Sequence, residues 1–296
     1  MHCKYRDESV SASRSLLFKY GMTKVIRFTK MHGAGNDYIY VYSPDNPIAN
    51  PGKAALKWSK PHTGIGSDGL IIIGRSDKAD FSMRMFNNDG SEGKMCGNGI
   101  RCVGKYVYDH SLTNKKTVTV ETLAGIKTIV LHTDETGMVD SATVDMGEPS
   151  TDAGKWMVSG GEGQMSVKVP QGTFVDMGSP HYVIFTEDIN TVKLEEDGPA
   201  IERSGLFPDG CNIEFAQVTD DSTIRARVWE RGSGITLACG TGACAVAVAA
   251  RLTGRTDRQS TIVMDGGRLH IDWRKDDNHI YMTGPAATVF EGEINL

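Results

Sequence analysis

An internal duplication is the feature that most limits how this chain can fold. Three landmarks recur in the same order in both halves: an aromatic-led apolar run, an Asp-Gly pair and a cysteine followed by Gly-x-Gly. They begin at Tyr38 and Tyr182, Asp68 and Asp209, and Cys96 and Cys239, with offsets of 144, 141 and 143 residues. A nearly constant offset indicates two homologous units. We therefore expect two similar lobes, divided near residues 140–150, with a functional cleft between them.

Strands are expected to predominate, because short β-type runs alternate with Gly, Asn and Asp. In the first half these runs are Val25–Lys30, Tyr38–Tyr42, Leu70–Gly74, Phe81–Asn87, Val118–Thr122 and Gly125–Leu131, and a comparable series follows residue 165. The clear helical patterns are Pro51–Lys60, Ile100–His110 and Ala243–Leu252. Residues 1–21 are interpreted as a leader outside the fold, because a strand-bearing segment begins at Met22.

Composition narrows the class of partner. The net charge of −5 and the pI near 5.9 disfavour the broad basic surface that nucleic-acid binding requires. No apolar run reaches the length of a membrane span. Six cysteines without a secretory signal indicate free thiols in a reducing cytoplasm. We therefore expect a cytoplasmic protein with a small-molecule partner, and neither nucleic acid nor membrane.

The two cysteine-led glycine turns carry the predicted chemistry. Cys96-Gly97-Asn98-Gly99 and Cys239-Gly240-Thr241-Gly242 each directly precede a helical pattern. Unpaired N–H groups at a helix N-terminus stabilise anions, so each turn is expected to lower the pKa of its thiol and to cradle a carboxylate. A thiolate on one face and a thiol on the other can invert the α-carbon of an amino acid. Neither pyridoxal phosphate nor a metal is expected.

The cysteines allow other interpretations. Cys3, Cys102, Cys211 and Cys244 are expected to be small buried side chains. A four-thiolate zinc site is disfavoured, because spacings of six and five residues do not match zinc knuckles. A disulfide between Cys96 and Cys239 is open on oxidation, as a consequence of proximity rather than as the function.

Five stretches, FTKMHGAGNDY, FNNDGSEGKMCGNGIRC, GCNIEF, RVWERGSGITLACGTGACA and YMTGPA, closely resemble the diaminopimelate epimerase family. The resemblance runs from about Phe28 to the C-terminus. It implies cofactor-free interconversion of LL- and meso-diaminopimelate, a cytoplasmic step toward lysine and peptidoglycan, by a homodimer. It also implies an α+β fold of two pseudo-symmetric lobes, each a strand-rich, barrel-like mixed sheet around a central helix. The lobes would comprise residues 22–140 with 285–296, and residues 141–284.

Matched positions assign roles by the same resemblance. Cys96 and Cys239 would be the acid–base pair, and Arg231 and Glu230 would pair with a carboxylate and an ammonium at the distal end of the substrate. The expected substrate-binding residues are Asn36, Asn87, Gly97, Asn98, Asn212, Glu230, Arg231, Gly240 and Thr241. Supporting positions are His181, which would orient a thiol or fill a turn, Ser179 and Gly69. The family commonly has Asn at position 179 and some members have Gln at position 69, so looser distal contacts are expected.

Two rival functions remain at the sequence level. A proline or hydroxyproline racemase shares the two-thiol mechanism and the fold, but it needs no Glu-Arg grip on a distal amino-acid end. A non-enzymatic binding protein on the same lobes would have no use for both thiols in their glycine turns. Proton exchange between substrate and solvent separates an enzyme from a binding protein.

Overall fold

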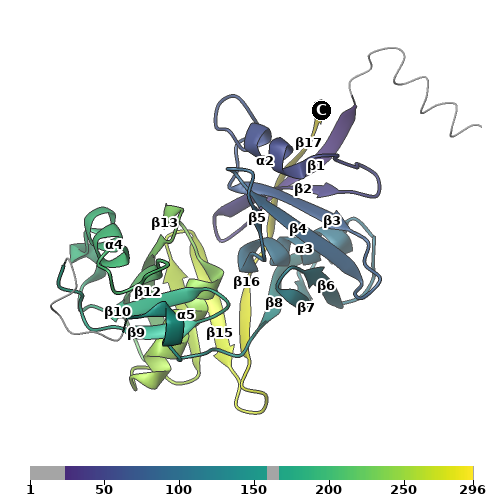
Figure 1. The fold of residues 1–296 in the computed structure, drawn as a ribbon. Helices are drawn as coiled ribbons and strands as arrows, with labels where there is room; N and C mark the ends of the chain where they lie inside the picture. Colours follow the sequence, from purple (N-terminus) through teal and green to yellow (C-terminus); the bar gives the residue numbers. More distant parts are fainter. Residues whose placement is uncertain (1–23, 159–166, 296) are drawn as a thin grey trace, which may run out of the picture.

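The computed structural model describes residues 24–158 and 167–295, so the expected leader at 1–21 lies outside the described residues. Within these ranges one connected sheet system contains 17 strands (Figure 1). The first-half elements are β1 (Val25–Gly33), β2 (Asn36–Tyr42), α2 (Pro51–Trp58), β3 (Gly69–Gly74), β4 (Phe81–Asn87), β5 (Glu92–Gly93), α3 (Gly97–Asp109), β6 (Thr117–Thr122), β7 (Gly125–Thr133) and β8 (Val139–Gly147). All six strands expected there are present.

The second half repeats this series. Its elements are β9 (Thr173–Asp176), β10 (Pro180–Phe185), α4 (Leu194–Glu202), β11 (Asn212–Val218), β12 (Thr223–Glu230), β13 (Gly234–Thr236), α5 (Gly240–Leu252), β14 (Gln259–Met264), β15 (Gly267–Trp273) and β16 (Ile280–Pro285). Two short 3₁₀ turns, Gly154–Trp156 and Ile189–Thr191, and a final strand, β17 (Ala287–Asn295), lie outside the repeat.

Strand pairing confirms that the two halves are homologous. β2 runs parallel to β3 as β10 does to β11, and β4 runs parallel to β6 as β12 does to β14. The pairs β3–β4, β6–β7 and β7–β8 are antiparallel, as are β11–β12, β14–β15 and β15–β16. Each strand from β1 to β8 thus corresponds to the strand eight places later. The predicted α+β class with two homologous lobes is therefore correct.

The register corrects one part of the predicted duplication. Tyr38 faces Gly69 across β2 and β3, and His181 faces Asn212 across β10 and β11. Both positions are therefore related by an offset of 143 residues, the same as the two cysteines, and Tyr38 is equivalent to His181 rather than to Tyr182. The error arose because both registers align apolar runs, although a slip of one residue moves every side chain to the opposite face.

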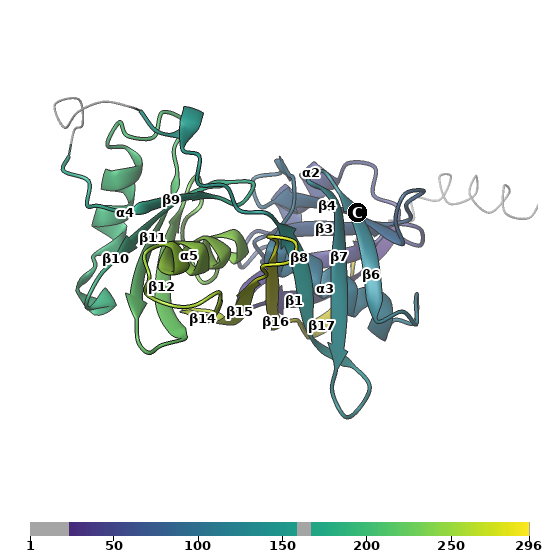
Figure 2. The same ribbon diagram turned by 90° about the horizontal axis from the view of Figure 1, so that it is seen from below.

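A central helix lies inside each lobe. α3 contacts β1, β2, β7 and β8, and α5 contacts β9, β10, β14 and β15 (Figure 2). The first ten residues of α3 are nearly all buried, and so is α5 from Ala243 to Ala250. Smaller apolar clusters lie beneath α2 and α4 on the outer faces of the sheets. The helices at the cysteine turns are thus the cores of their lobes.

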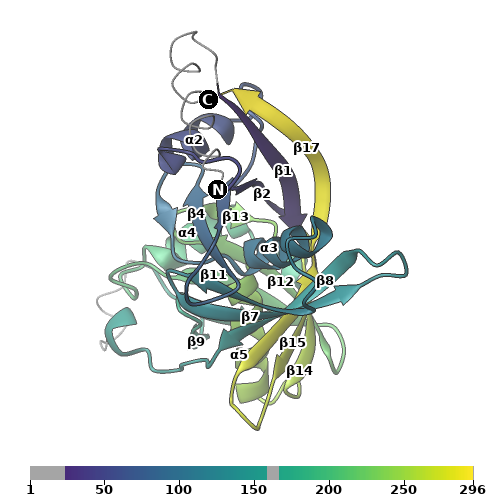
Figure 3. The ribbon, with the colours of Figure 1, turned by 90° about the vertical axis from the view of Figure 1, so that its right-hand side faces the viewer.

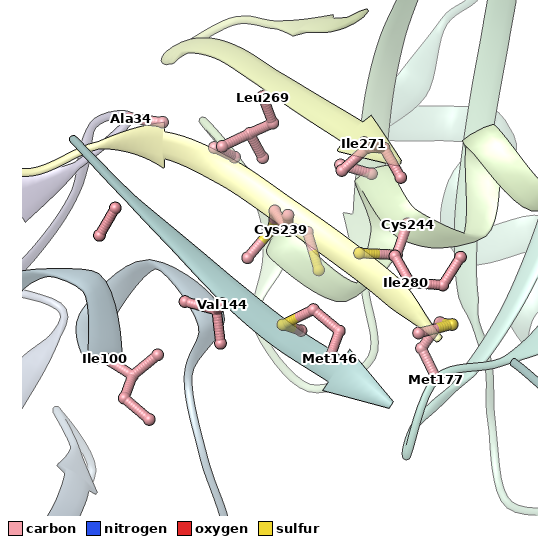
Figure 4. Packing of buried hydrophobic residues seen from close by; sticks show 14 of the residues in the cluster. Ala34, Ile100, Val144, Met146, Met177, Cys239, Cys244, Leu269, Ile271 and Ile280 are labelled. Atoms are coloured by element: carbon pink, nitrogen blue, oxygen red, sulfur yellow. The ribbon is translucent and has the colours of Figure 1, made fainter. Parts of the chain in front are cut away.

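Two strand contacts join the lobes. β8 pairs antiparallel with β16, and Val144, Met146 and Ile280 from these strands lie in the core between the two central helices (Figure 4). The chain then returns along β17, which pairs with β1 (Figure 3). The expected lobe boundaries, 22–140 with 285–296 and 141–284, remain a prediction, because β8 crosses the first of them. Within the described residues, no helix is long and apolar enough to cross a membrane.

Candidate active site

Cys96 and Cys239 are the N-cap residues of α3 and α5. Cys96 Sγ accepts a hydrogen bond from the N–H of Gly99 at 3.3 Å, and Cys239 Sγ accepts one from Gly242 at 3.4 Å. Both cysteines have extended backbones that lead directly into the helix. The helices begin three residues earlier than the sequence pattern predicted, because glycine is a poor helix former and its run reads as a turn. Each thiol nevertheless lies at a helix N-terminus, as expected.

Glycine lets the two helix ends approach each other. A β-carbon built on Gly97 would lie 2.8 Å from Met282 Cε and 3.7 Å from the Cα of Gly240. A β-carbon on Gly240 would lie 3.2 Å from the same methyl group. Contacts this short leave no space for a side chain at Gly97. The N-termini of α3 and α5 therefore converge, and so do their unpaired N–H groups.

Both cysteines line one cleft of about 850 Å³. Ten of the other expected residues line the same cleft: Asn36, Asn87, Gly97, Asn98, Ser179, Asn212, Glu230, Arg231, Gly240 and Thr241. His181 and Gly69 do not line it. A β-carbon on Gly69 would lie 2.1 Å from the carbonyl oxygen of Phe86, so this position has no space for a side chain without a shift of the sheet.

Cys96 is half-buried among neutral groups. Its Sγ donates to Asn36 Oδ1 at 3.2 Å, and Asn36 Nδ2 donates to Asp68 Oδ2 at 2.6 Å. Burial raises the pKa of the Cys96 thiol, although the Gly99 N–H and the Tyr38 hydroxyl act in the opposite direction. Burial also raises the pKa of Asp68. Sequence reasoning missed Tyr38 and Asp68 as neighbours of the thiol, although both belong to the repeated landmarks.

Cys239 is 6% exposed and lies beside two carboxylates. Its pKa is raised well above the usual range, first by burial and then by the negative charges of Glu230 and Glu214. Burial likewise raises the pKa of Glu230, which hydrogen bonds to Cys239 and to the Thr236 hydroxyl. The predicted lowering of both thiol pKa values is therefore wrong. Desolvation of a buried thiolate outweighs the hydrogen bonds at the helix N-terminus.

A buried ion-pair geometry lies behind Cys239. His181 Nδ1 is 2.6 Å from Glu214 Oε1, and both side chains are fully buried. His181 Nε2 is 3.0 Å from the hydroxyl oxygen of Ser179. The sequence pointed to His181 but missed Glu214, because an acidic residue in a strand of apolar neighbours carries no signal of its partner.

Asn212 and Arg231 form the outer part of the second-lobe wall. Asn212 Oδ1 accepts from the backbone N–H of Arg231 at 2.8 Å, and Asn212 Nδ2 donates to the carbonyl of Pro180 at 2.9 Å. The exposed Arg231 guanidinium donates to the carbonyl of Asp209 at 2.8 Å and lies over the Trp156 ring. Asn212 therefore orients the backbone that carries Arg231.

Asn87 and Asn98 play different parts in the first-lobe wall. The side chain of Asn87 lines the cleft and donates to Ser91 Oγ at 3.0 Å. Asn98 is buried, accepts from Arg101 at 2.8 Å and donates to the carbonyl of Ala238 at 3.1 Å. Its side chain joins the two lobes, so its backbone N–H is the part free to face a ligand.

The remaining described cysteines match the prediction of buried side chains. Cys102, Cys211 and Cys244 are fully buried, and Cys3 lies outside the described residues. Burial raises the pKa of Cys102 to about 11 and that of Cys244 to about 12. No cluster of three or more His, Cys, Asp or Glu side chains arranged for a metal ion occurs in the described part of the chain.

The fold with facing lobes is shared with solved structures of low sequence identity. A phenazine biosynthesis protein from Bacillus anthracis has a TM-score of 0.66 at 17% identity, with 92% of this chain and 100% of that chain covered. A hydroxyproline epimerase from Agrobacterium vitis has a TM-score of 0.64 at 13% identity, with 92% and 91% covered. The chain therefore has the two-lobed fold of this group, and the racemase-type proteins are distant structural relatives.

Sequence comparison is more specific. The family model described as diaminopimelate epimerase matches residues 28–151 and 173–289. The diaminopimelate epimerase of Bacteroides thetaiotaomicron is 59% identical over 275 residues, covering 92% of this chain and 99% of that protein. That of Phocaeicola vulgatus is 54% identical over 281 residues, covering 93% and 100%. The chain belongs to the diaminopimelate epimerase family.

Proposed function

We propose that this protein interconverts LL- and meso-diaminopimelate, with Cys96 and Cys239 as the acid–base pair. The observation that carries the proposal is that two N-capping thiols line one cleft at converging helix ends. The relatives named diaminopimelate epimerase, at 50–59% identity, supply the substrate. A proline racemase activity is disfavoured, because racemase-type structures share only 13–14% identity.

The chemistry requires two groups on opposite faces of the α-carbon. One sulfur, as thiolate, takes the α-proton, and the other, as thiol, donates a proton to the opposite face. The N–H groups at the starts of α3 and α5 stabilise the charge that develops on the α-carboxylate. Burial favours the protonated form of both thiols, so an approaching α-ammonium promotes ionisation of the sulfur that acts as base.

Substrate binding divides between the lobes. The exposed guanidinium of Arg231 is suited to a distal carboxylate, since a planar fork can pair with both carboxylate oxygens. Asn36, Asn87 and Asn212 add polar groups along the cleft wall. Glu230 lies beside Cys239, so we assign it to the reacting end, in place of the distal ammonium expected from the sequence.

The proposal also covers the setting of the reaction. The enzyme would act without pyridoxal phosphate, as a homodimer in the cytoplasm, on the route to lysine and peptidoglycan. Family membership supports the pathway, and five thiols that are free in the structure suit a reducing compartment. Residues 22–140 with 285–296 and residues 141–284 would form its two lobes.

The test is an assay of LL-diaminopimelate epimerisation in deuterium oxide, with and without a pyridoxal phosphate scavenger. We expect turnover that the scavenger does not change, and product that carries deuterium at the inverted carbon from the earliest turnovers. Recovered substrate should gain label more slowly, because the base that removed its proton is placed to return it. Early product free of deuterium, or turnover of L-proline but not of LL-diaminopimelate, contradicts the proposal.

A further inference from the structure

The second lobe contains a buried acid–base pair that the first lobe lacks. With an offset of 143 residues, His181 is equivalent to Tyr38 and Ser179 to Asn36. Below the helix starts, Glu214 Oε1 is the nearest atom to a β-carbon on Gly242, whereas Ile71 is nearest to one on Gly99. The pair His181–Glu214 is therefore a feature of Cys239 alone.

A chain of hydrogen bonds connects this pair to Cys239. His181 Nε2 is 3.0 Å from Ser179 Oγ, and the Ser179 hydroxyl donates to Thr241 Oγ1 at 3.4 Å. Thr241 Oγ1 is in turn 3.4 Å from Cys239 Sγ. Ser179 and Thr241 line the cleft, whereas the two ends of the chain are buried. The sulfur therefore has a hydroxyl-lined connection to an interior base.

The polarity of the chain defines how many protons the pair holds. Because the single Ser179 proton is donated to Thr241, His181 Nε2 must carry a hydrogen that it donates to Ser179. The 2.6 Å contact between His181 Nδ1 and Glu214 requires a second proton. Two protons make the pair neutral overall, as its full burial favours. Among the described residues, no donor reaches Glu214 Oε2, so Glu214 serves His181 alone.

We propose that the His181–Glu214 pair is the proton reservoir of Cys239 and that the hydroxyls of Ser179 and Thr241 carry the proton between turnovers. The inference rests on the proposed two-thiol reaction. Each turnover leaves the acid as thiolate and the base as thiol, and both must be reset before the next. Cys96 is half-buried and open to the cleft, whereas Cys239 is only 6% exposed. Cys239 therefore gains more from an internal donor.

The transfer is balanced in atoms and charge. After Cys239 has protonated the product, the Thr241 O–H bond breaks and an S–H bond forms. The Ser179 proton moves to Thr241, and the Nε2 proton of His181 moves to Ser179. The remaining proton stays between Nδ1 and Glu214, so one negative charge moves from the sulfur to the pair. Water in the cleft returns the proton through the same two hydroxyls, and the reverse reaction runs these steps backward.

The test compares Ser179→Ala, Ser179→Thr and Glu214→Gln with the unchanged enzyme in steady-state assays. Resetting of free enzyme follows product release, so it limits kcat but does not enter kcat/KM. We expect Ser179→Ala and Glu214→Gln to lower kcat about tenfold or more and to lower KM in parallel. The two variants should also show a larger solvent deuterium effect on kcat. Ser179→Thr, which keeps the hydroxyl, should recover most of the lost kcat.

The outcomes are separable. A fall in kcat/KM that matches the fall in kcat would mean that these side chains act in binding, folding or the chemical step, and it overturns the inference. An unchanged kcat in Ser179→Ala overturns it as well. Ser179 lies on the cleft wall, so this variant tests the chain even if Glu214→Gln fails to fold. An unchanged enzyme without epimerase activity would instead refute the proposed function.

Discussion

The two thiols occupy equivalent positions in the repeat but have different electrostatic surroundings. Cys96 has the neutral groups Asn36 and Tyr38 as its nearest partners, whereas Cys239 lies beside Glu230 and the His181–Glu214 pair. Burial raises both pKa values, but carboxylate charge raises the pKa strongly only at Cys239. A duplicated scaffold thus provides matching positions, and its side chains make the two positions chemically unequal.

This inequality suits a substrate whose faces differ. Inversion at one carbon requires groups on both faces, and a repeat with pseudo-twofold symmetry supplies them from two helix ends. The rest of diaminopimelate extends to one side only, so the distal end must be recognised asymmetrically. Asn88 of the first lobe is equivalent to Arg231 of the second by the 143-residue offset, and only Arg231 offers a charged fork.

The largest expected effect is the loss of either thiol. Cys96→Ala and Cys239→Ala should each lower the rate of epimerisation by about a thousandfold or more, because each removes an acid–base group from one face. Circular dichroism should remain native in both variants. Cys102→Ala is the matched control, since Cys102 is buried in the same helix that Cys96 caps, and its loss should affect activity far less. Near-normal turnover in either N-cap variant would mean that one thiol suffices.

A smaller effect is expected at the distal end. Arg231→Lys should lower kcat/KM by roughly 10- to 100-fold, because an ammonium cannot reproduce the bidentate fork. Asn88→Ala, the change at the equivalent first-lobe position, should have a much smaller effect. Steady-state assays with LL-diaminopimelate check both. Equal losses in the two variants would show that the distal end is held symmetrically.

The carboxylate beside Cys239 should control that thiol more than the other. Glu230→Gln removes the largest charge contribution to the raised pKa of Cys239, so this pKa should fall and alkylation should begin at lower pH. At any pH below the pKa, lowering the pKa by about one raises the thiolate fraction roughly tenfold. Iodoacetamide rates for each cysteine, followed by peptide mass spectrometry across pH, measure the effect. A change of equal size at Cys96 contradicts the proposed asymmetry.

The sequence could predict the repeat, the first-lobe strands and the two thiol turns, because these depend on local patterns. It missed α4, since Gly198 and Pro199 interrupt the helical pattern. In the structure, Gly198 lets α4 pack closely against Trp229, where a β-carbon would lie 2.6 Å from the Trp229 side chain. Tertiary packing therefore supports a helix that its own residues disfavour.

The electrostatics of the site were less accessible than its membership. Ten of the twelve binding or supporting residues expected beside the cysteines line the cleft, because glycine turns and strand ends meet at the lobe boundary. The rise in both thiol pKa values could not be read from the helix starts alone, since burial is a tertiary property. Glu214 was missed for the same reason, because its partner His181 lies on another strand.

The smallest expected effect tests the neutral side of the comparison. Tyr38 donates a hydrogen bond that lowers the pKa of Cys96, while burial dominates in the opposite direction. Tyr38→Phe removes this donor, so the pKa of Cys96 should rise and its alkylation should move to higher pH, with rates about threefold lower near pH 8. Alkylation of Cys239 should not change, because its partners belong to the other lobe. If the Cys96 profile does not move, the Tyr38 hydroxyl does not stabilise the thiolate, and the backbone N–H groups of α3 are its main support.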